Sequence, residues 1–368
     1  MKILTSESVN IGHSDKCCDT IADAFLDEAL RQDPNAQMAV ECAIKDDLLM
    51  VYGEATTTAE IDYTAIANQI LTEVIGYPKP FRVLQQISKQ SSDINKAVVQ
   101  EELRANDQGI VYGYACTETP ELMPLPIMLA HKLMRKYEEF RRSAAAGGNF
   151  YSDAKSQVSI AYDENDKPKF IATILISASH AERLSKEQVR VIIGDEVVSP
   201  ILAEYADMLA ADTQIIVNPS GRFVTWGSYS DSGCVGRKIV VDTYGGIGRV
   251  GGGCFSSKNA TKVDRSGAYY ARYVAKNIVA AGLADRCEIQ VSYGIGLAEP
   301  LSVHIEYFGT NKKKPAEIEK YVKKNFCFKP ASIIKELDLL KPIYQATACY
   351  GHFGREEFSW EQIKGDAK

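Results

Sequence analysis

The sequence lacks an excess of positive charge and lacks any long apolar run. Its 42 lysines and arginines stand against 48 aspartates and glutamates, for a net charge of −6. A general nucleic-acid or membrane-surface binder usually carries a positive excess, so both classes are disfavoured. No apolar run approaches the roughly 18 to 20 residues that span a bilayer. The opening residues, MKILTSESV, contain no apolar stretch typical of a signal peptide, and we expect a cytoplasmic protein.

The nine cysteines also lack the pattern of a metal or disulfide framework. Their number is odd, none forms a C-x-x-C pair, and Cys17 and Cys18 are adjacent. Most of them lie in apolar or helical runs such as ECAI and YACTE. This pattern disfavours a zinc site and predicts buried, reduced thiols.

What the chain does have is a supersecondary unit that occurs three times. Each unit reads as helix, two strand-like runs and a second helix. Gly76 suits a helix end, Pro126 a first helical turn and Ser185 an N-cap. The predicted units cover residues 18–29, 38–44, 48–55 and 63–76; then 125–140, 156–162, 169–177 and 185–202; then 264–283, 288–293, 301–307 and a helix from 315.

This order predicts an α+β fold of three helix–hairpin–helix domains, each a sheet with helices on one face. The strands are too apolar for their other face to meet water, so it must pack against a sister domain or a second subunit. The repeat could also have arisen by chance, because helix–hairpin–helix order is common.

A glycine-rich stretch at 245–266, GGIGRVGGGCFSSKNATKVDRS, follows the strand-like run KIVVDTY. Its glycines match G-x-G-x-x-G, but the next helix begins only near Asp264, so a Rossmann turn is excluded. The P-loop pattern is also missing. With both motifs excluded, the stretch still offers glycine backbone N–H groups that an anion can approach, with basic residues close by. These are Arg249, Lys258, Lys262 and Arg265. We predict a polyphosphate site, with Asp264 either holding a metal or only capping the helix.

Other short motifs pair basic residues with aspartate in the same way. GHSDK puts His13 and Asp15 at the start of the first helix, although His13 could be only a cap or a core residue. An aromatic side chain in GRF could stack on a base. The remaining candidates are Asp153 and Lys155 in DAKSQ, Arg222 and Phe223 in GRF, and Asp231, Arg237 and Lys238 in SDSGCVGRK. In an acidic chain these motifs favour one assembled Mg²⁺–polyphosphate pocket.

Many of these motifs together resemble one family. SESVNIGHSDK, KQSSDIN, DAKSQV, GGGCFSSKNATKVDRS, ARYVAKN and YGHFGRE are similar to S-adenosylmethionine synthetase (methionine adenosyltransferase), in that family's order and over nearly the whole chain. The resemblance implies three pseudo-threefold α+β domains over 1–99, 104–224 and 226–361. It also implies a homodimer or a dimer of dimers with sites between subunits.

The implied reaction joins ATP and L-methionine into S-adenosylmethionine and then hydrolyses tripolyphosphate to pyrophosphate and phosphate, with Mg²⁺ and K⁺. By motif, His13 would donate to the oxygen leaving C5′, and Asp15 and Asp264 would each hold Mg²⁺. The implied triphosphate clamp is Lys155, Arg237, Lys238, Lys258 and Lys262. Other implied ATP contacts are Asp107, Asp153, Arg222, Phe223, Asp231 and Cys254. The implied methionine contacts are Glu54, Gln90, Asp231 and Lys262, and Glu41 is the implied K⁺ ligand.

The chain departs from the family pattern at five positions. Ile11 stands where the family usually has glutamate, and the other departures are Ser14, Ser92, Cys254 and Ser257. The stretch from Gly76 to Gln90 is also shorter than usual. These changes concern loop stiffness, rate and the methionine pocket, because every charged catalytic position is retained.

Two other functions use the same residues. A Mg-ATP kinase or ligase would cleave at phosphorus rather than at C5′. An inactive regulatory subunit should have lost some of Asp15, Lys155, Lys238 or Asp264, and this chain keeps them all.

Overall fold

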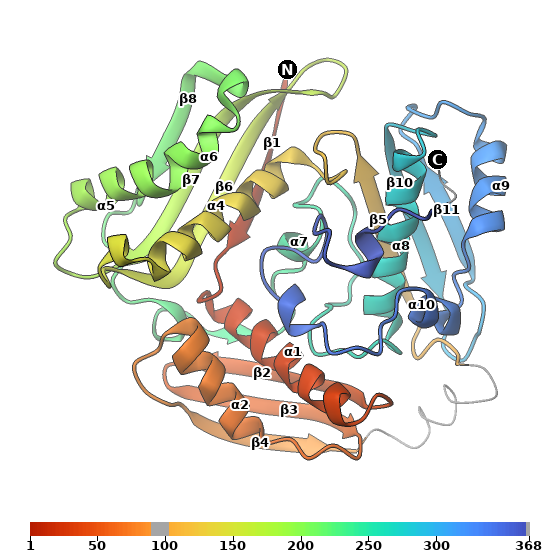
Figure 1. Cartoon of the computed structure of the whole chain (residues 1–368), viewed down its shortest axis with the longest axis horizontal. Coiled ribbons are helices and arrows are strands. Elements are labelled where there is room, and N and C mark those ends of the chain that lie inside the picture. The colour runs from red at the N-terminus through yellow and green to blue at the C-terminus, as the bar shows by residue number, and fades with distance from the viewer. Residues whose placement is uncertain (90–102, 366–368) are drawn as a thin grey trace.

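The computed structural model describes residues 1–89 and 103–365. Within these residues the strands form three sheets, and Figure 1 shows three lobes, each with helices over one face of a sheet. The predicted α+β class is therefore confirmed. No helix in the described parts of the chain is long and apolar enough to cross a membrane.

The first sheet has the strand order β4-β3-β2-β9. Alternate residues of β2 (Met38, Val40, Cys42 and Ile44) are buried, which places one face of the strand against the core beneath α1. Helix α2 continues into a π-helical turn that ends at Gly76 with φ of 96°, as its glycine predicts. The elements are α1 (Ser14–Gln32), β2 (Gln37–Lys45), β3 (Leu48–Thr56), α2 (Tyr63–Gln69), the π-helical turn (Ile70–Ile75), β4 (Arg82–Ser88) and β9 (Gly233–Cys234).

The second sheet has the order β1-β6-β7-β8. Pro126 lies in the first turn of α4, and Ser185 caps α5 through a capping box with Gln188, as predicted. The single helix predicted for 185–202 is instead interrupted by a π-helical turn. The elements are β1 (Lys2–Val9), α4 (Leu125–Arg142), β6 (Phe150–Tyr162), β7 (Pro168–His180), α5 (Lys186–Ile193), the π-helical turn (Gly194–Val198), α6 (Ser199–Ala203) and β8 (Leu209–Val217).

The third sheet has the order β11-β10-β5 and is covered by α8. Tyr270, Val274 and Ile278 on the predicted apolar stripe of α8 are buried. The strand-like reading of KIVVDTY was wrong, because residues 239–242 form a short helix, α7. The elements are β5 (Gly109–Cys116), α7 (Ile239–Asp242), α8 (Val263–Ala280), β10 (Arg286–Tyr293), β11 (Ser302–Glu306), α9 (Pro315–Asn325) and α10 (Pro330–Glu336).

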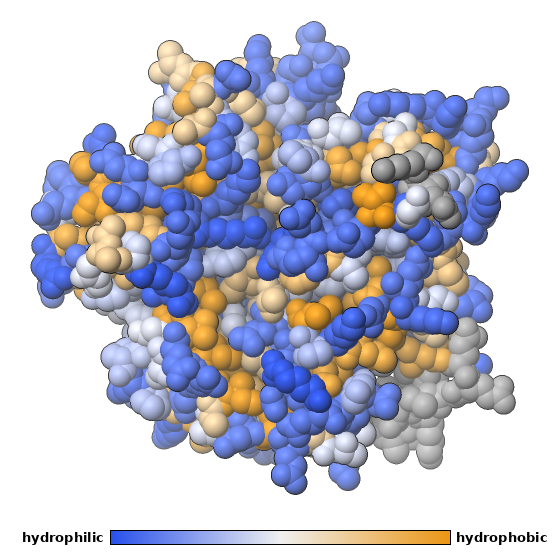
Figure 2. Space-filling model, viewed as in Figure 1, coloured by the Kyte–Doolittle hydropathy of each residue, from blue (hydrophilic) through white to orange (hydrophobic). Residues whose placement is uncertain are grey.

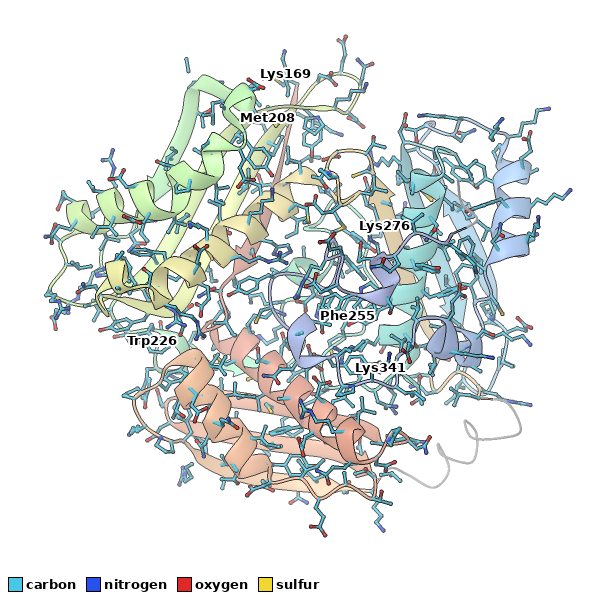
Figure 3. All side chains as sticks on the ribbon, viewed as in Figure 1. Lys169, Met208, Trp226, Phe255, Lys276 and Lys341 are labelled. Atoms are coloured by element: carbon cyan, nitrogen blue, oxygen red, sulfur yellow. The ribbon has the colours of Figure 1, made fainter. Side chains whose placement is uncertain are left out.

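Each of the three predicted hairpins forms, but strands from outside the hairpins complete the sheets. Strand β1 pairs with β6, so that Lys2 lies opposite Tyr162. Strand β5 pairs with β10, and β9 pairs with β2. Each sheet is thus formed by segments that are distant in the sequence. Phe255, near the middle of Figure 3, packs edge-on against Tyr269 and Phe353, whose segments come from different parts of the chain.

Several strands carry large apolar side chains that remain exposed in the single chain. They occur on strands of all three sheets: Ile3 (β1), Met50 (β3), Leu84 (β4), Ile110 (β5), Ile215 (β8) and Val303 (β11). The face shown in Figure 2 is by contrast mainly hydrophilic, with separate hydrophobic patches. These exposed apolar residues agree with the prediction from the sequence that a partner covers the sheets, and that partner stays a prediction.

Candidate active site

Helix α1 begins at His13, which acts as its N-cap. The ring Nδ1 accepts a hydrogen bond from the backbone N–H of Asp15 at 3.2 Å. Because Nδ1 is an acceptor, the proton of the neutral ring lies on Nε2. The cap interpretation is therefore correct, and it leaves Nε2–H available as a donor.

The surroundings of His13 keep its ring neutral. Burial, together with the positive charges of Lys238 and Lys155, lowers the pKa of His13 to about 3. The nearby Asp15 opposes this shift without cancelling it. The side chain is thus a neutral hydrogen-bond donor throughout the physiological pH range.

Asp15 is almost fully buried in the first turn of α1. Its Oδ1 accepts the N–H of Cys234 at 3.0 Å, and its Oδ2 accepts from Lys238 Nζ at 2.7 Å. Burial raises the pKa of Asp15, but the bonds from Lys238 and Cys234 outweigh burial and hold that pKa below its usual value. Gly233 permits this arrangement, since a Cβ there would lie 2.2 Å from the carbonyl oxygen of Ser14.

Four further predicted residues lie around this helix end. Burial raises the pKa of Asp153 to about 6, and its Oδ2 accepts the N–H of Gly227 at 2.8 Å. Lys155 and Asp231 lie near enough to act on the charge of Asp153, and Arg237 lies 3.5 Å from Asp15 Oδ1. We call this set the α1 cluster: His13, Asp15, Asp153, Lys155, Asp231, Arg237 and Lys238.

A second group gathers at the first turn of α8. Lys258 Nζ lies 2.7 Å from Asp264 Oδ2, and both side chains are partly exposed. A Cβ on Gly253 would lie 2.1 Å from the Asp264 carboxyl carbon, so glycine is required there. Asp264 is not the N-cap, because the cap position belongs to Lys262. The interpretation of Asp264 as only a helix cap is therefore wrong.

Other predicted residues surround the Lys258–Asp264 pair. Burial lowers the pKa of Lys262, which the nearby Glu54 and Asp107 partly offset. Burial also raises the pKa of Cys254 to about 11, with Lys258 opposing and Glu41 reinforcing the shift. We call this set the α8 cluster: Glu41, Glu54, Asp107, Cys254, Lys258, Lys262 and Asp264.

The segment 233–238 connects the two clusters. Its Cys234 and Lys238 contact Asp15, while a Cβ on Gly236 would lie 2.4 Å from the Cβ of Cys254. The structure therefore brings fourteen of the seventeen predicted site residues into two groups that share one loop.

The remaining predicted residues lie elsewhere. Arg222 is exposed and pairs with Glu182, and the N–H of Phe223 donates to His180 Nε2 at 3.2 Å. Both contacts belong to the end of β7 and its following loop rather than to either cluster. Gln90, like the departure at Ser92, lies outside the described residues.

Two basic residues of the glycine-rich stretch have structural contacts instead. Arg265 is fully buried and forms a bidentate pair with Asp23 at 2.7 and 2.8 Å. Arg249 is exposed and lies 3.3 Å from Glu288. The assignment of Arg265 to the anion site was therefore wrong, because a buried bidentate pair has no donors left for a ligand. Arg249 belongs to neither cluster, and its assignment stays a prediction.

Sequence reasoning also missed a buried ion network directly behind the α1 cluster. Lys16 is 1% exposed and contacts both Asp19, at 2.8 Å, and Asp242 at the end of α7. Because Lys238 is the N-cap of α7, Lys16–Asp242 and Asp15–Lys238 link the same two helices. The available signal was the recurrence of aspartate at 15, 19 and 23, every fourth residue of α1.

Ser257 stands where the family pattern has glycine. Its backbone adopts the left-handed conformation, which explains why glycine is usual at this position. Its φ is 78°, and its Oγ is buried with no hydrogen-bond partner among the described residues. We expect Ser257→Gly to stabilise the protein by about 1 kcal/mol, because left-handed strain of about 1–2 kcal/mol exceeds the entropy that glycine costs. Thermal denaturation measures this as a midpoint rise of roughly 1–2 °C.

The neighbouring Ser256 is the matched control for that substitution. It is equally buried and its Oγ also has no partner in the described chain, but its φ is not positive. Ser256→Gly should therefore give the smaller gain or a loss. Equal effects of the two substitutions would contradict the strain at Ser257.

The sequence was compared with known protein families. Residues 1–101 match the S-adenosylmethionine synthetase N-terminal domain, residues 102–223 the central domain and residues 226–362 the C-terminal domain. The chain belongs to the S-adenosylmethionine synthetase family. The resemblance stated from the motifs is thus confirmed along the whole chain.

Membership defines the enzyme class. S-adenosylmethionine synthetases are methionine adenosyltransferases, which make S-adenosylmethionine from ATP and L-methionine, and all three domains of the family are present here. The two clusters lie in segments matched by the N-terminal, central and C-terminal domains.

Proposed function

We propose that the methionine sulfur attacks C5′ of ATP at the two clusters described above. An S–C5′ bond forms, the C5′–O5′ bond breaks, and the electron pair leaves with tripolyphosphate. Water then splits tripolyphosphate into pyrophosphate and phosphate. The observation that carries this proposal is that Asp15 and Asp264, each in the first turn of a helix, each bind one lysine at 2.7 Å.

This arrangement suits the leaving group. Negative charge grows on the triphosphate oxygen during the reaction, and preorganised cations and helix N-termini stabilise such charge. The neutral His13, with its proton on Nε2, would donate to the oxygen that leaves C5′. The proposed triphosphate clamp is Lys155, Arg237, Lys238, Lys258 and Lys262.

The carboxylates of both clusters fit Mg²⁺, a hard cation that prefers oxygen ligands. Asp264 Oδ1 makes no hydrogen bond within the described residues, and Asp15 Oδ2 accepts only from Lys238. Two bound Mg²⁺ ions would neutralise the triphosphate oxygens. No group of three potential ligands occurs in the described chain, so phosphate and water would complete the coordination. Glu41, which accepts from Tyr52 at 3.4 Å, is the proposed K⁺ ligand.

The remaining site residues would bind the rest of the two substrates. Glu54, Gln90 and Lys262 would contact methionine, and Asp231 would contact methionine or ribose. Phe223 would pack on adenine. Asp107, Asp153, Arg222 and Cys254 complete the proposed ATP contacts.

A product assay with ATP and methionine tests the proposal directly. We expect S-adenosylmethionine, phosphate and pyrophosphate in equal amounts, followed by chromatography and phosphate analysis. Release of ADP or AMP without a sulfonium product would instead support a kinase or ligase that cleaves at phosphorus.

We further propose that the site is shared between two subunits, with the α1 cluster of one chain facing the α8 cluster of its partner. The apolar residues exposed on all three sheets support a partner of this kind. Mixing His13→Ala with Lys258→Ala chains should then restore activity, because one of the two sites in a mixed dimer keeps both wild-type groups. At equal mixing we expect about a quarter of wild-type activity for a closed two-fold dimer.

Two controls accompany the mixing experiment. Each variant alone should be inactive. No recovery after subunit exchange, or a fully active monomer in sedimentation, would mean that each chain holds its own complete site.

A further inference from the structure

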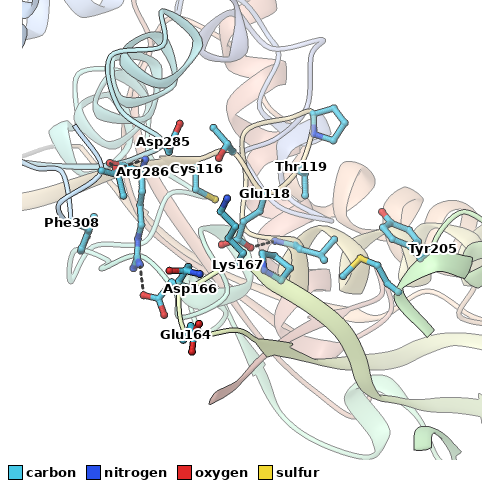
Figure 4. A pocket seen from close by; sticks show the side chains of 17 residues that line it. Cys116, Glu118, Thr119, Glu164, Asp166, Lys167, Tyr205, Asp285, Arg286 and Phe308 are labelled. Carbon is cyan, nitrogen blue, oxygen red and sulfur yellow. Dashed lines mark hydrogen bonds and ion pairs between the residues drawn. The ribbon is translucent and has the colours of Figure 1, made fainter. Parts of the chain in front are cut away.

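A large cavity lies away from both clusters. Its volume is about 890 Å³, which is within the range of small-molecule sites. Its walls come from the loop after β5, the turn between β6 and β7, the start of β10 and Phe308, and none of the residues of the α1 or α8 cluster lines it. Figure 4 shows these side chains converging from separate segments.

Arg286 provides this cavity with unused hydrogen-bond donors. Its Nη1 lies 3.6 Å from Asp166 Oδ2, and its Nε is fully buried, so only the two terminal nitrogens can reach a ligand. The guanidinium stacks on Phe308, with 4.0 Å between Cζ and the ring centroid. Stacking fixes the plane of the guanidinium and leaves its N–H edge available, the geometry that binds carboxylate or phosphate through two bonds.

The acidic residues in the wall are, in contrast, mostly engaged. Glu118 accepts from the N–H of Leu125 at 3.0 Å and from Tyr162 at 2.8 Å, and burial raises its pKa. Asp285 pairs with Lys312 at 2.5 Å and Asp166 with Lys2 at 2.6 Å. Lys167, like Arg286, lines the cavity, and in the described parts of the chain it makes no ion pair. Glu164 also lines the cavity from the exposed turn between β6 and β7. The charged groups left to bind a ligand are thus the two cations, Arg286 and Lys167, against this one carboxylate.

Apolar groups line another part of the cavity. Tyr205 lies opposite Arg286 in Figure 4, and Met208 belongs to the same lining. We propose that this cavity is a second ligand site, which takes a small organic anion. Its carboxylate or phosphate binds Arg286 and Lys167, and its apolar or aromatic body lies toward Tyr205 and Met208.

Titration of the full-length protein with phenyl phosphate and with 3-phenylpropionate, followed by ligand-detected NMR, tests this proposal. We expect at least one probe to bind with a dissociation constant in the low millimolar range, as its small size allows. Tighter binding of phenyl phosphate would identify a phosphate ligand, and tighter binding of 3-phenylpropionate a carboxylate.

Three variants locate the binding. Arg286→Gln should weaken it by about tenfold, the loss of a charge-assisted pair. Lys167→Glu, in an exposed turn where folding is not at risk, should weaken it by about threefold or more. Lys258→Ala should leave it unchanged, because Lys258 belongs to the α8 cluster.

Three results would overturn the proposal. The first is that neither probe binds at tenfold higher concentration. The second is that folded Arg286→Gln and Lys167→Glu proteins bind the probes as well as the wild type does. The third is that Lys258→Ala loses binding, which would put the probe at the α8 cluster.

Discussion

In the Asp264→Asn variant we expect turnover to fall by about a hundredfold or more while the fold is retained, because one preorganised electrostatic group would be lost. Asparagine preserves the shape of the side chain but removes the charge that faces Lys258 at 2.7 Å. The loss of an acid from the first turn of α8 costs at most about 1 kcal/mol of stability. Steady-state kinetics at varied Mg²⁺ should show a weaker dependence on the metal.

Asp15→Asn should behave in the same way, and the double variant should lose less than the sum, because both aspartates would act on one triphosphate under the proposed mechanism. Glu317→Gln is the control, since Glu317 also lies in a first helical turn, that of α9, but outside both clusters. Wild-type turnover and Mg²⁺ response in Asp264→Asn would show that Asp264 is not a ligand.

The largest loss of stability is expected for Lys16→Met. Burial lowers the pKa of Lys16, but the adjacent Asp19 and Asp242 outweigh burial and raise it, so the ammonium is charged. Methionine fills the same space and leaves two buried carboxylates without their cation. Breaking a buried ion pair costs about 3–5 kcal/mol, which chemical denaturation measures.

The control for Lys16→Met is Lys136→Met, which breaks a pair of the same i,i+3 spacing on α4. The side chain of Lys136 is partly exposed and that of Glu139 is largely exposed. This change should therefore cost about 0.5 kcal/mol of stability or less. Adding Asp242→Asn to Lys16→Met should recover part of the loss by removing one unpaired charge. Equal stabilities of the two lysine variants would contradict the role of the buried network.

Local patterns predicted the hairpins and most helices. The alternation in MAVECAI and the 3.6-residue stripe of α8 are properties of neighbouring residues, and they appear as β2 and α8. The pairing of β1 with β6 and of β5 with β10 was not predictable, because no local signal identifies a partner more than 150 residues away. KIVVDTY was misread for a related reason: its apolar run is short, and such runs do not distinguish strand from helix.

Membership of the α1 and α8 clusters was predictable where a short motif joins small residues to charges. GHSDK and KNATKVD supplied His13, Asp15, Lys258, Lys262 and Asp264. Burial was not predictable: Arg265 and Lys258 look alike in the sequence, yet one is enclosed with Asp23 and the other reaches Asp264 at the surface. Only tertiary packing distinguishes a structural cation from one available to a ligand.

The pairing of strands that are distant in the sequence also affects how the chain folds during synthesis. Strand β1 leaves the ribosome first, yet its partner β6 emerges only after about 150 further residues have been made. Until then the edge of β1, with Ile3 exposed, has no native neighbour, and such edges favour aggregation. Likewise β5 waits for β10. A nascent chain of this enzyme therefore completes no sheet of the second or third lobe until the segments that hold β6 and β10 have been made.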